Sequence, residues 1–236
     1  MSDAPLTAAE LAELAKIDTP TICNALEITS PERRADGFSF KPLVCPFPDL
    51  PPIVGYARTA IIRATHRSPR TKQQDRELRL RYYRQFETGP KPTIAVIQDL
   101  DGPLVGFGAF WGEVQTTIHK GLGCLGVVTD GCVRDITMMA PGFQVLAGSI
   151  TPSHAWVHLV DIGGAVSVGG MMVSDGDLIH ADRHGAVVIP HAAARKVAAA
   201  ADLCARREAP LLAAARKPGF SVADLERAMG EADDIH

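Results

Sequence analysis

The spacing of hydrophobic and polar positions along the chain predicts a mixed α/β fold. Apolar residues recur every three or four positions in some segments, which is the period of a helix, and form short continuous runs in others, which is typical of buried strands. Glycine-broken apolar runs over 155–189 predict a β-rich second layer. The expected helices cover 7–16, a segment that starts at Thr19 with Pro20 in its first position, 73–86, 113–120, 135–140, 192–215 and 222–229. The expected strands cover 92–98, 125–129 and 143–147, with a strand pair or one bent strand over 53–64.

Proline and charge set two segments apart from this pattern. Six prolines between residues 31 and 52 exclude a regular element and predict an extended connector. Residues 66–91 carry six arginines and two lysines against three acids, with Leu78, Tyr82, Tyr83 and Phe86 at helical spacing. This predicts a basic amphipathic helix. The helix either docks an acidic partner or RNA, or packs on its own domain with a solvated arginine face. Charge runs are usually solvent faces, which favours the second interpretation.

Composition and charge narrow the classes of function. The chain has 236 residues, of which 46% are hydrophobic and 22% charged, as expected of one globular domain. A net charge of −3 provides no global positive field for nucleic acid or an anionic membrane. No apolar run approaches the roughly 18–20 residues of a membrane span, and the first residues lack the pattern of a signal peptide. Five widely spaced cysteines without a C-x-x-C motif predict reduced thiols in a cytoplasmic protein.

The candidate chemistry lies in residues 106–135. A glycine loop opens into a predicted helix at Gly112 and Glu113, where free backbone N–H groups can bind a carboxylate or a phosphate. The glycine spacing matches neither a dinucleotide fingerprint nor a P-loop. A predicted strand then runs into Arg134 and Asp135. The arginine offers a planar fork for a carboxylate, and the aspartate offers a hard oxygen ligand for Mg²⁺ or Mn²⁺. The same pair could instead only fix a turn.

Three motifs in the chain resemble the RraA-like family. They are LAKIDTPTICNAL near the start, WGE followed by GLGCLGVVTDGCVRD, and SDGDLIHADRHGAVVIP. The family includes class II pyruvate aldolases that act on 4-hydroxy-4-methyl-2-oxoglutarate and 4-carboxy-4-hydroxy-2-oxoadipate. The resemblance implies an α/β/β sandwich of the swivelling β/β/α type, formed as a single domain over 1–236. It further implies a basic helical insertion at about 66–91, a C-terminal helical arm at about 192–236, and a homotrimer or hexamer.

The same resemblance implies a divalent-metal-dependent C–C lyase. It would cleave a 4-hydroxy-2-oxo acid to pyruvate and an oxo product, with oxaloacetate decarboxylation as a side activity. Asp135 would be the only direct protein ligand of the metal. Mg²⁺ is the expected ion, and Mn²⁺ or Co²⁺ would be accepted by the same type of ligand. Glu113 and Glu208 of a neighbouring subunit would hold the metal through water. The implied catalytic residues are Arg134, Glu113 and Asp135.

Substrate binding follows from the resemblance in the same way. Arg134 would grip the pyruvate-like end of the oxo-acid and stabilise the enolate. Gly112 would also contribute to substrate binding, and the backbone amides of Val114 and Gln115 would hold the substrate carboxylate. Lys120, the nearest lysine, lies at the far end of the predicted helix, which disfavours Schiff-base chemistry.

Departures from the family pattern concern the substrate more than the reaction. The segment 66–91 is longer than usual, and a basic helix over the pocket mouth, acting through Arg79 and Arg84, would select a dicarboxylate or tricarboxylate. His119 stands where a small apolar residue is expected. His180 and His184 have the spacing of a helical metal pair but straddle a strand and a turn, which favours structural roles.

A non-catalytic function is the alternative. The family also contains regulators that bind ribonuclease E, so this chain could bind a ribonuclease or another protein partner. Regulators of that type are expected to lack the carboxylate after the arginine. The Arg134-Asp135 pair of this chain favours the enzyme.

Overall fold

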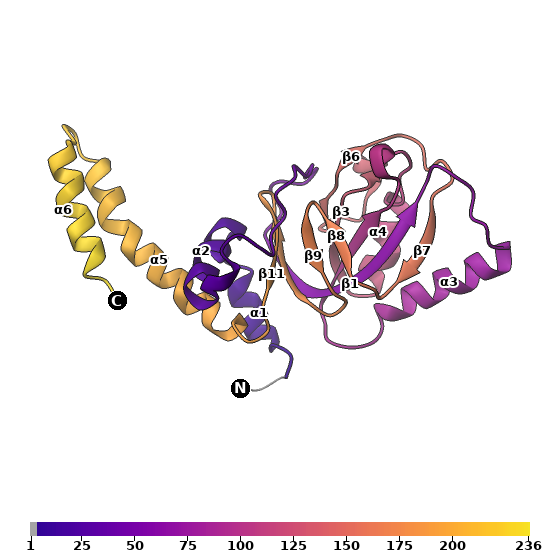
Figure 1. Ribbon diagram of the computed structural model, residues 1–236, viewed down its shortest axis with the longest axis horizontal. Helices are drawn as coiled ribbons and strands as arrows, with labels where there is room; N and C mark the ends of the chain where they lie inside the picture. Colours follow the sequence, from indigo (N-terminus) through magenta and orange to yellow (C-terminus); the bar gives the residue numbers. More distant parts are fainter. Residues whose placement is uncertain (1–3) are drawn as a thin grey trace.

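The computed structural model describes residues 4–236 and is built around a seven-stranded sheet (Figure 1). The strands follow the order β11-β10-β1-β2-β3-β5, and β7 also pairs with β1. Their bounds are β1 (Ile53–Arg63), β2 (Thr93–Asp99), β3 (Cys124–Thr129), β5 (Gln144–Leu146), β7 (His158–Ile162), β10 (Leu178–Asp182) and β11 (Gly185–Ile189).

Strand β1 is a single long strand, which decides between the two possibilities that the sequence left open. Along one edge it pairs in parallel with β2, and β2, β3 and β5 continue the parallel arrangement. Along its other edge it changes partner, from β10 at Ile53–Tyr56 to β7 at Ala60–Arg63, both antiparallel. This change of partner curls the sheet.

Alternate residues of the central strands face two different layers, because successive side chains in a strand point to opposite faces. On β2, Ile94 and Val96 pack against a hairpin formed by β8 (Val166–Val168) and β9 (Met171–Val173). Ala95 and Ile97 pack on the opposite side, in the cluster that contains aromatic residues of α3. Helices α3 (Lys72–Gln85) and α4 (Glu113–Gly121) lie on that side. The arrangement confirms the predicted α/β/β sandwich and its β-rich second layer.

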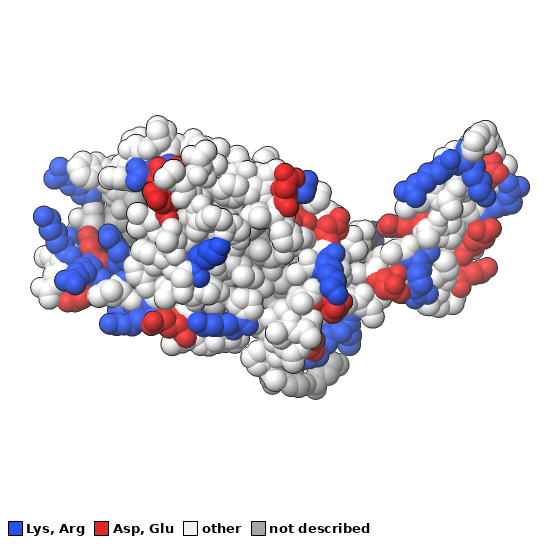
Figure 2. Space-filling model, turned by 180° about the vertical axis from the view of Figure 1, so that it is seen from behind, with Lys and Arg blue, Asp and Glu red and all other residues white. Residues whose placement is uncertain are grey.

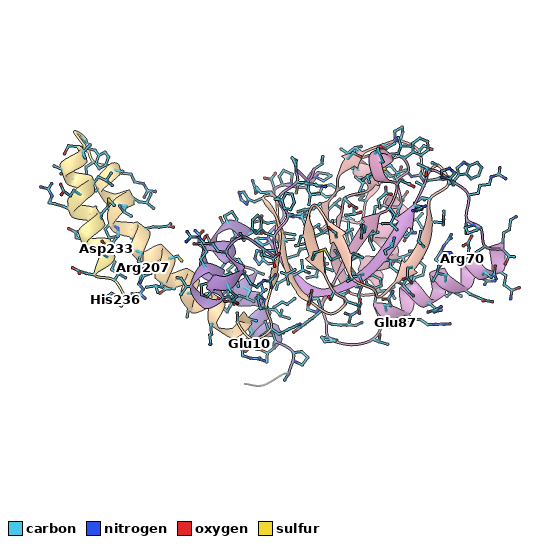
Figure 3. The ribbon with its side chains drawn as sticks, in the orientation of Figure 1. Glu10, Arg70, Glu87, Arg207, Asp233 and His236 are labelled. Atoms are coloured by element: carbon cyan, nitrogen blue, oxygen red, sulfur yellow. The ribbon has the colours of Figure 1, made fainter. Side chains whose placement is uncertain are left out.

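The terminal helices form the end of the molecule opposite α3 (Figure 1). They are α1 (Ala8–Leu14), α2 (Thr19–Thr29), α5 (Ala194–Ala215) and α6 (Val222–Asp233). Helix α5 packs against α1 and α2, then leaves the body of the domain and is joined by α6, which folds back along it. Arg207 on α5 donates to the carbonyl of Ile235 at 2.9 Å, which ties the end of the chain to the arm (Figure 3).

Three local predictions differ from the structure. Helix α2 has Asp18 as its N-cap, so Pro20 occupies the second helical position and not the first. The segment 135–140 forms only a short 3₁₀ turn, η3 (Ile136–Met138). The proline-rich connector holds one such turn, η1 (Pro31–Arg33), because a single turn of this kind needs few of the backbone hydrogen bonds that proline removes. The remaining short elements are η2 (Gly102–Leu104), β4 (Cys132–Val133) and β6 (Ser149–Ile150).

The expectations for the cysteines and for membrane spans agree with the structure. All five cysteines are free thiols. Within residues 4–236, no helix combines the length and the apolar character needed to cross a membrane.

Histidine side chains in the core have structural partners. His119 on α4 is fully buried, and its Nδ1 donates to the Gln115 carbonyl at 2.7 Å. The hydroxyl of Tyr82 on α3 then donates to His119 Nε2, also at 2.7 Å. His180 is held in the same manner by Thr19 and the carbonyl of Ile17. These contacts give His119 a structural role in the core, and they confirm the structural interpretation of His180.

Burial of His119 makes stability depend on pH. Burial lowers its pKa to about 4, so the folded protein keeps this ring neutral while the unfolded chain protonates it near pH 6.5. The contribution of this ring to the free energy of unfolding is therefore fully present above pH 6.5 and is lost as the pH falls toward 4. We expect a loss of about 2 kcal/mol from this group between pH 7 and pH 5.

The measurement is urea unfolding of the wild type and of His119→Gln at both pH values. Asp130, whose pKa burial raises to about 6, acts in the opposite direction in this range, so the difference between the two proteins isolates the histidine. An identical pH dependence in both proteins would contradict the expectation.

Candidate active site

A pocket of about 340 Å³ brings together five of the residues singled out in the sequence. They are Gly112, Val114, Gln115, Arg134 and Asp135. The pocket lies between the start of α4, the turn after β4, helix α3 and the segment before β7. The sequence motifs that follow two different strands therefore meet at one cavity.

Backbone pairing brings the arginine turn to the glycine loop. Trp111 pairs with Val133 of β4, and the N–H of Arg134 donates to the carbonyl of Trp111 at 2.9 Å. The indole of Trp111 is fully buried and stacks on Phe143. A rigid core residue thus fixes where the turn begins.

Asp135 has a backbone conformation that side chains rarely adopt. Its φ is 56° and its ψ 36°, in the left-handed region. Such strain in a non-glycine residue is concentrated at functional sites. The conformation directs the carboxylate onto Gly112, where a Cβ would lie 2.6 Å from Asp135 Oδ2. Gly112 itself has an extended backbone with φ −169°, so the close approach of the carboxylate, and not backbone strain, requires glycine here.

Helix α4 offers free backbone donors to the same pocket. Its N-cap, Gly112, has no side chain to satisfy the first N–H groups. The first intrahelical bond runs from Thr116 to the Gly112 carbonyl at 3.1 Å. Within the described chain, the N–H groups of Glu113, Val114 and Gln115 have no acceptor. Such a helix start favours an anion.

The donor set fits a hard divalent cation held by one carboxylate. Asp135 Oδ2 lies 3.4 Å from Arg134 Nε, which is long for a hydrogen bond, and its side chain is 38% exposed. Residues 4–236 contain no group of three or more histidine, cysteine or acidic side chains arranged as a metal site. Mg²⁺ commonly keeps several waters and takes only one or two protein carboxylates.

Two of the implied metal residues do not line this pocket. Glu113 is the first residue of α4, next to the lining residues, and is exposed. Glu208 lies exposed on α5, in the arm that leaves the body of the domain. The role of each remains a prediction, and for Glu208 it requires a second copy of the chain.

Other acids near the strand ends have structural partners. Asp99 accepts hydrogen bonds from Gly106 at 2.9 Å and Asp101 at 3.0 Å, and Asp130 accepts from the N–H of Asp99 at 2.8 Å. Burial raises the pKa of Asp99 and of Asp130. These carboxylates stabilise the loop that leads to the pocket but do not line it.

Four further polar residues of the lining are not among the predicted catalytic and substrate-binding residues. They are Asp75, Arg79, His154 and His158. Arg79 on α3 was expected at the pocket mouth and does line it, together with Asp75. His154 and His158 complete the lining, and each has its Nδ1 bonded to a backbone carbonyl. The periodicity of α3 could have identified Asp75, four residues before Arg79. His154 lies in an irregular segment and His158 begins β7, and neither position carries such a signal.

Arg84, which was expected to act with Arg79, is absent from the lining and exposed. Five residues correspond to a rotation of about 140° around a helix, so the two arginines lie on different faces of α3. The hydrophobic face of α3 packs on the domain through Tyr82 and Phe86, which are both fully buried. The amphipathic helix with a solvated arginine face is thereby confirmed.

The fold and the pocket together define a class of protein: an α/β/β sandwich whose glycine loop, helix start and Arg-Asp turn enclose one polar cavity. Residues 19–188 match the family model described as RraA-like, Aldolase/RraA, and the chain belongs to that family. The family includes aldolases as well as RraA regulators of ribonucleases.

Two solved structures show the same fold, and one further relative is similar in sequence. An uncharacterized protein from Pseudomonas syringae matches over 98% of this chain and 97% of its own, with a TM-score of 0.71 and 20% identity. Streptomyces coelicolor RraAS2, described as an unusual member of the RNase ES inhibitor RraA family, matches over 91% and 99%, with a TM-score of 0.66 and 20% identity. An uncharacterized protein of Methanocaldococcus jannaschii is 40% identical over 83 residues, which is 34% of this chain and 40% of that relative.

Proposed function

We propose that this protein is a divalent-metal-dependent carbon–carbon lyase that cleaves a 4-hydroxy-2-oxo acid to pyruvate and an oxo product. The observation that carries the proposal is the convergence of Arg134, Asp135 and the unpaired N–H groups of α4 on one pocket. In the proposed mechanism, Arg134 and the N–H groups bind two parts of the oxo-acid, and Asp135 holds the cation. An Arg-Asp pair that served only to fix a turn would not need the unpaired N–H groups of α4 beside it.

The reaction breaks the bond between C3 and C4 of the substrate. The electron pair passes to C3, the 4-hydroxyl loses its proton and becomes a carbonyl, and the pyruvate enolate takes a proton at C3. Oxaloacetate gives the same enolate when carbon dioxide leaves, which is why its decarboxylation is the expected side activity.

The chain's own groups stabilise that enolate. The N–H groups of Val114 and Gln115 bind the C1 carboxylate, where the α4 dipole favours negative charge. The Arg134 guanidinium donates to the keto oxygen as negative charge develops on it. Asp135 is the residue that holds the cation, and a bound divalent cation supplies Lewis-acid stabilisation of the same charge.

A Schiff-base mechanism lacks its nucleophile in this pocket. No lysine is found among the lining residues of the described chain. The side chain of Lys120 is exposed and donates to the carbonyl of Pro141 at the opposite end of α4. This supports metal-dependent chemistry.

Assembly belongs to the proposal as well. We expect a homotrimer or hexamer in which the α5–α6 arm carries Glu208 to a neighbouring pocket. The projection of the arm away from its own domain supports this arrangement (Figure 1).

A non-catalytic regulator is the second candidate. The likeness to Streptomyces coelicolor RraAS2 extends over the fold, and the basic face of α3 could receive an acidic protein partner. The Arg134-Asp135 pair inside the pocket favours the enzyme over this function.

Pyruvate release tests the choice between the two. Purified protein is incubated with 4-hydroxy-4-methyl-2-oxoglutarate and, separately, with oxaloacetate, with and without Mg²⁺ or Mn²⁺. Release of pyruvate that requires both protein and metal supports the lyase. Rates equal to those of metal alone would exclude it and favour the regulator.

Substitution of Gly112 tests the carboxylate cradle. In Gly112→Ala the new methyl group must displace the Asp135 carboxylate, and we expect kcat/KM to fall by at least about tenfold, because small displacements at a reacting centre are costly. The matched control is Gly121→Ala at the other end of α4, where a Cβ meets nothing within 4 Å. Equal activities in the two variants would show that the contact between Gly112 and Asp135 is not needed.

A further inference from the structure

Helix α3 brings to the pocket a positive charge that the proposed reaction does not use. Asp75 and Arg79 line the cavity together with Arg134 and Asp135. Residues four positions apart lie on the same face of a helix, so both side chains come from one stripe of α3. Lys and Arg side chains are numerous at this end of the molecule (Figure 2).

The charge of Asp75 is already compensated. Its Oδ1 lies 3.2 Å from Arg70 Nε and accepts a hydrogen bond from Ser68 at 2.8 Å. Arg70 lies at the start of the α3 segment and Glu87 just beyond its end (Figure 3). For Arg79, by contrast, residues 4–236 supply no acid within ion-pair distance. The α3 side of the cavity therefore has an unpaired guanidinium.

Contacts on both sides of α3 fix the position of the helix that carries Arg79, whose own side chain is exposed. Tyr82 bonds to buried His119, and the Tyr83 hydroxyl donates to Gln115 Oε1 at 3.1 Å, so α3 is joined to the first turns of α4. Arg70 donates to the carbonyl of Leu159, which joins the start of α3 to β7. The backbone of α3 is therefore in place before a ligand binds, and only the Arg79 side chain has to be ordered.

We propose that Arg79 is a specificity-determining residue that binds a second carboxylate of the substrate, at the end remote from the 2-oxo acid group. This inference rests on the proposed function, which assigns the 2-oxo acid end to Arg134 and α4. Asp135 is assigned to the cation, and Asp75 is paired with Arg70, so Arg79 is the lining cation left for a second anion. A charge-assisted contact of this kind discriminates strongly against a neutral end.

Two ligands of equal chain length distinguish binding at the remote end of the site from binding at the 2-oxo acid end. 2-Oxoglutarate and 2-oxopentanoate differ only in whether the remote carbon is a carboxylate or a methyl group, and neither has a 4-hydroxyl to cleave. Their affinities are measured by calorimetry in the presence of Mg²⁺ for the wild type, Arg79→Ala and Arg84→Ala. Arg84 is the matched control, because it removes an equal charge from another face of the same helix.

The expected result is a loss of about tenfold in 2-oxoglutarate affinity for Arg79→Ala, with 2-oxopentanoate affinity changed less than about twofold. Arg84→Ala should leave both affinities close to those of the wild type. If Arg79→Ala changes both ligands equally or neither, or if Arg84→Ala has the same effect, this assignment fails while the proposed function stands. If the wild type binds neither acid, the proposed function fails and the assignment fails with it.

Discussion

Asp135→Asn is expected to abolish metal-dependent pyruvate release, with a loss of at least about a thousandfold, because a metal supplies several kcal/mol of charge stabilisation. The substitution removes the negative charge of the carboxylate that we propose as the ligand of the cation, and it keeps the shape of the side chain. Asparagine also tolerates the left-handed backbone, where φ is 56°. Alanine would confound the result, because that conformation costs it roughly 1–2 kcal/mol.

The assay follows pyruvate from oxaloacetate and from 4-hydroxy-4-methyl-2-oxoglutarate at several Mg²⁺ concentrations. Oxaloacetate loses carbon dioxide unaided when metal is present, so the variant also serves as the background for the wild type. Urea unfolding verifies that the variant folds. Near-normal turnover by folded Asp135→Asn would move the metal site away from this turn.

Arg134→Ala is expected to lower kcat/KM by about a hundredfold to a thousandfold, the usual effect of removing one donor that stabilises a developing oxyanion. The guanidinium is partly exposed and close to Asp135, with Nε at 3.4 Å from Oδ2. Its removal therefore leaves no buried charge unpaired, and the fold should be unaffected. Arg134→Lys should recover only part of the activity, since an ammonium group lacks the planar fork.

The informative readout is the division between kcat and KM. Stabilisation of the enolate predicts that most of the loss appears in kcat, because the charge develops only in the transition state. A change confined to KM would reduce Arg134 to a ground-state binding residue. Unchanged kinetics would place the chemistry elsewhere in the protein.

The central part of the site was predictable because it depends on short-range order. A buried strand that ends in Arg134-Asp135, and a glycine loop that opens into α4, are visible as local patterns, and parallel strands bring their carboxyl ends together. The face of α3 was predictable for the same reason, since Tyr82 and Phe86 follow the helical period. Each of these three patterns lies within one short segment of the chain, so it can be recognised without knowing how distant segments pack.

The rest of the site depends on how distant segments meet. The left-handed backbone of Asp135, which directs its carboxylate onto Gly112, is indicated by no local pattern. His154 enters the pocket from the irregular segment before β7, and His158 from the first position of β7. Arg84 lies outside the pocket for a simpler reason, because the helix turns by about 140° between Arg79 and Arg84, and the net charge of 66–91 carries no information on that rotation.

The hydrogen bond between Tyr82 and His119 has a consequence for the descent of this chain. The basic segment 66–91 and the unexpected histidine on α4 are distant in sequence, yet in the fold each supplies half of one buried contact at 2.7 Å. A relative without a counterpart of α3 would leave this imidazole without its donor inside the core, at a cost of about 1–3 kcal/mol. The two features should consequently have been acquired as a pair and should be inherited as a pair. We expect members of the family without a counterpart of α3 to carry a residue other than histidine at the position of His119.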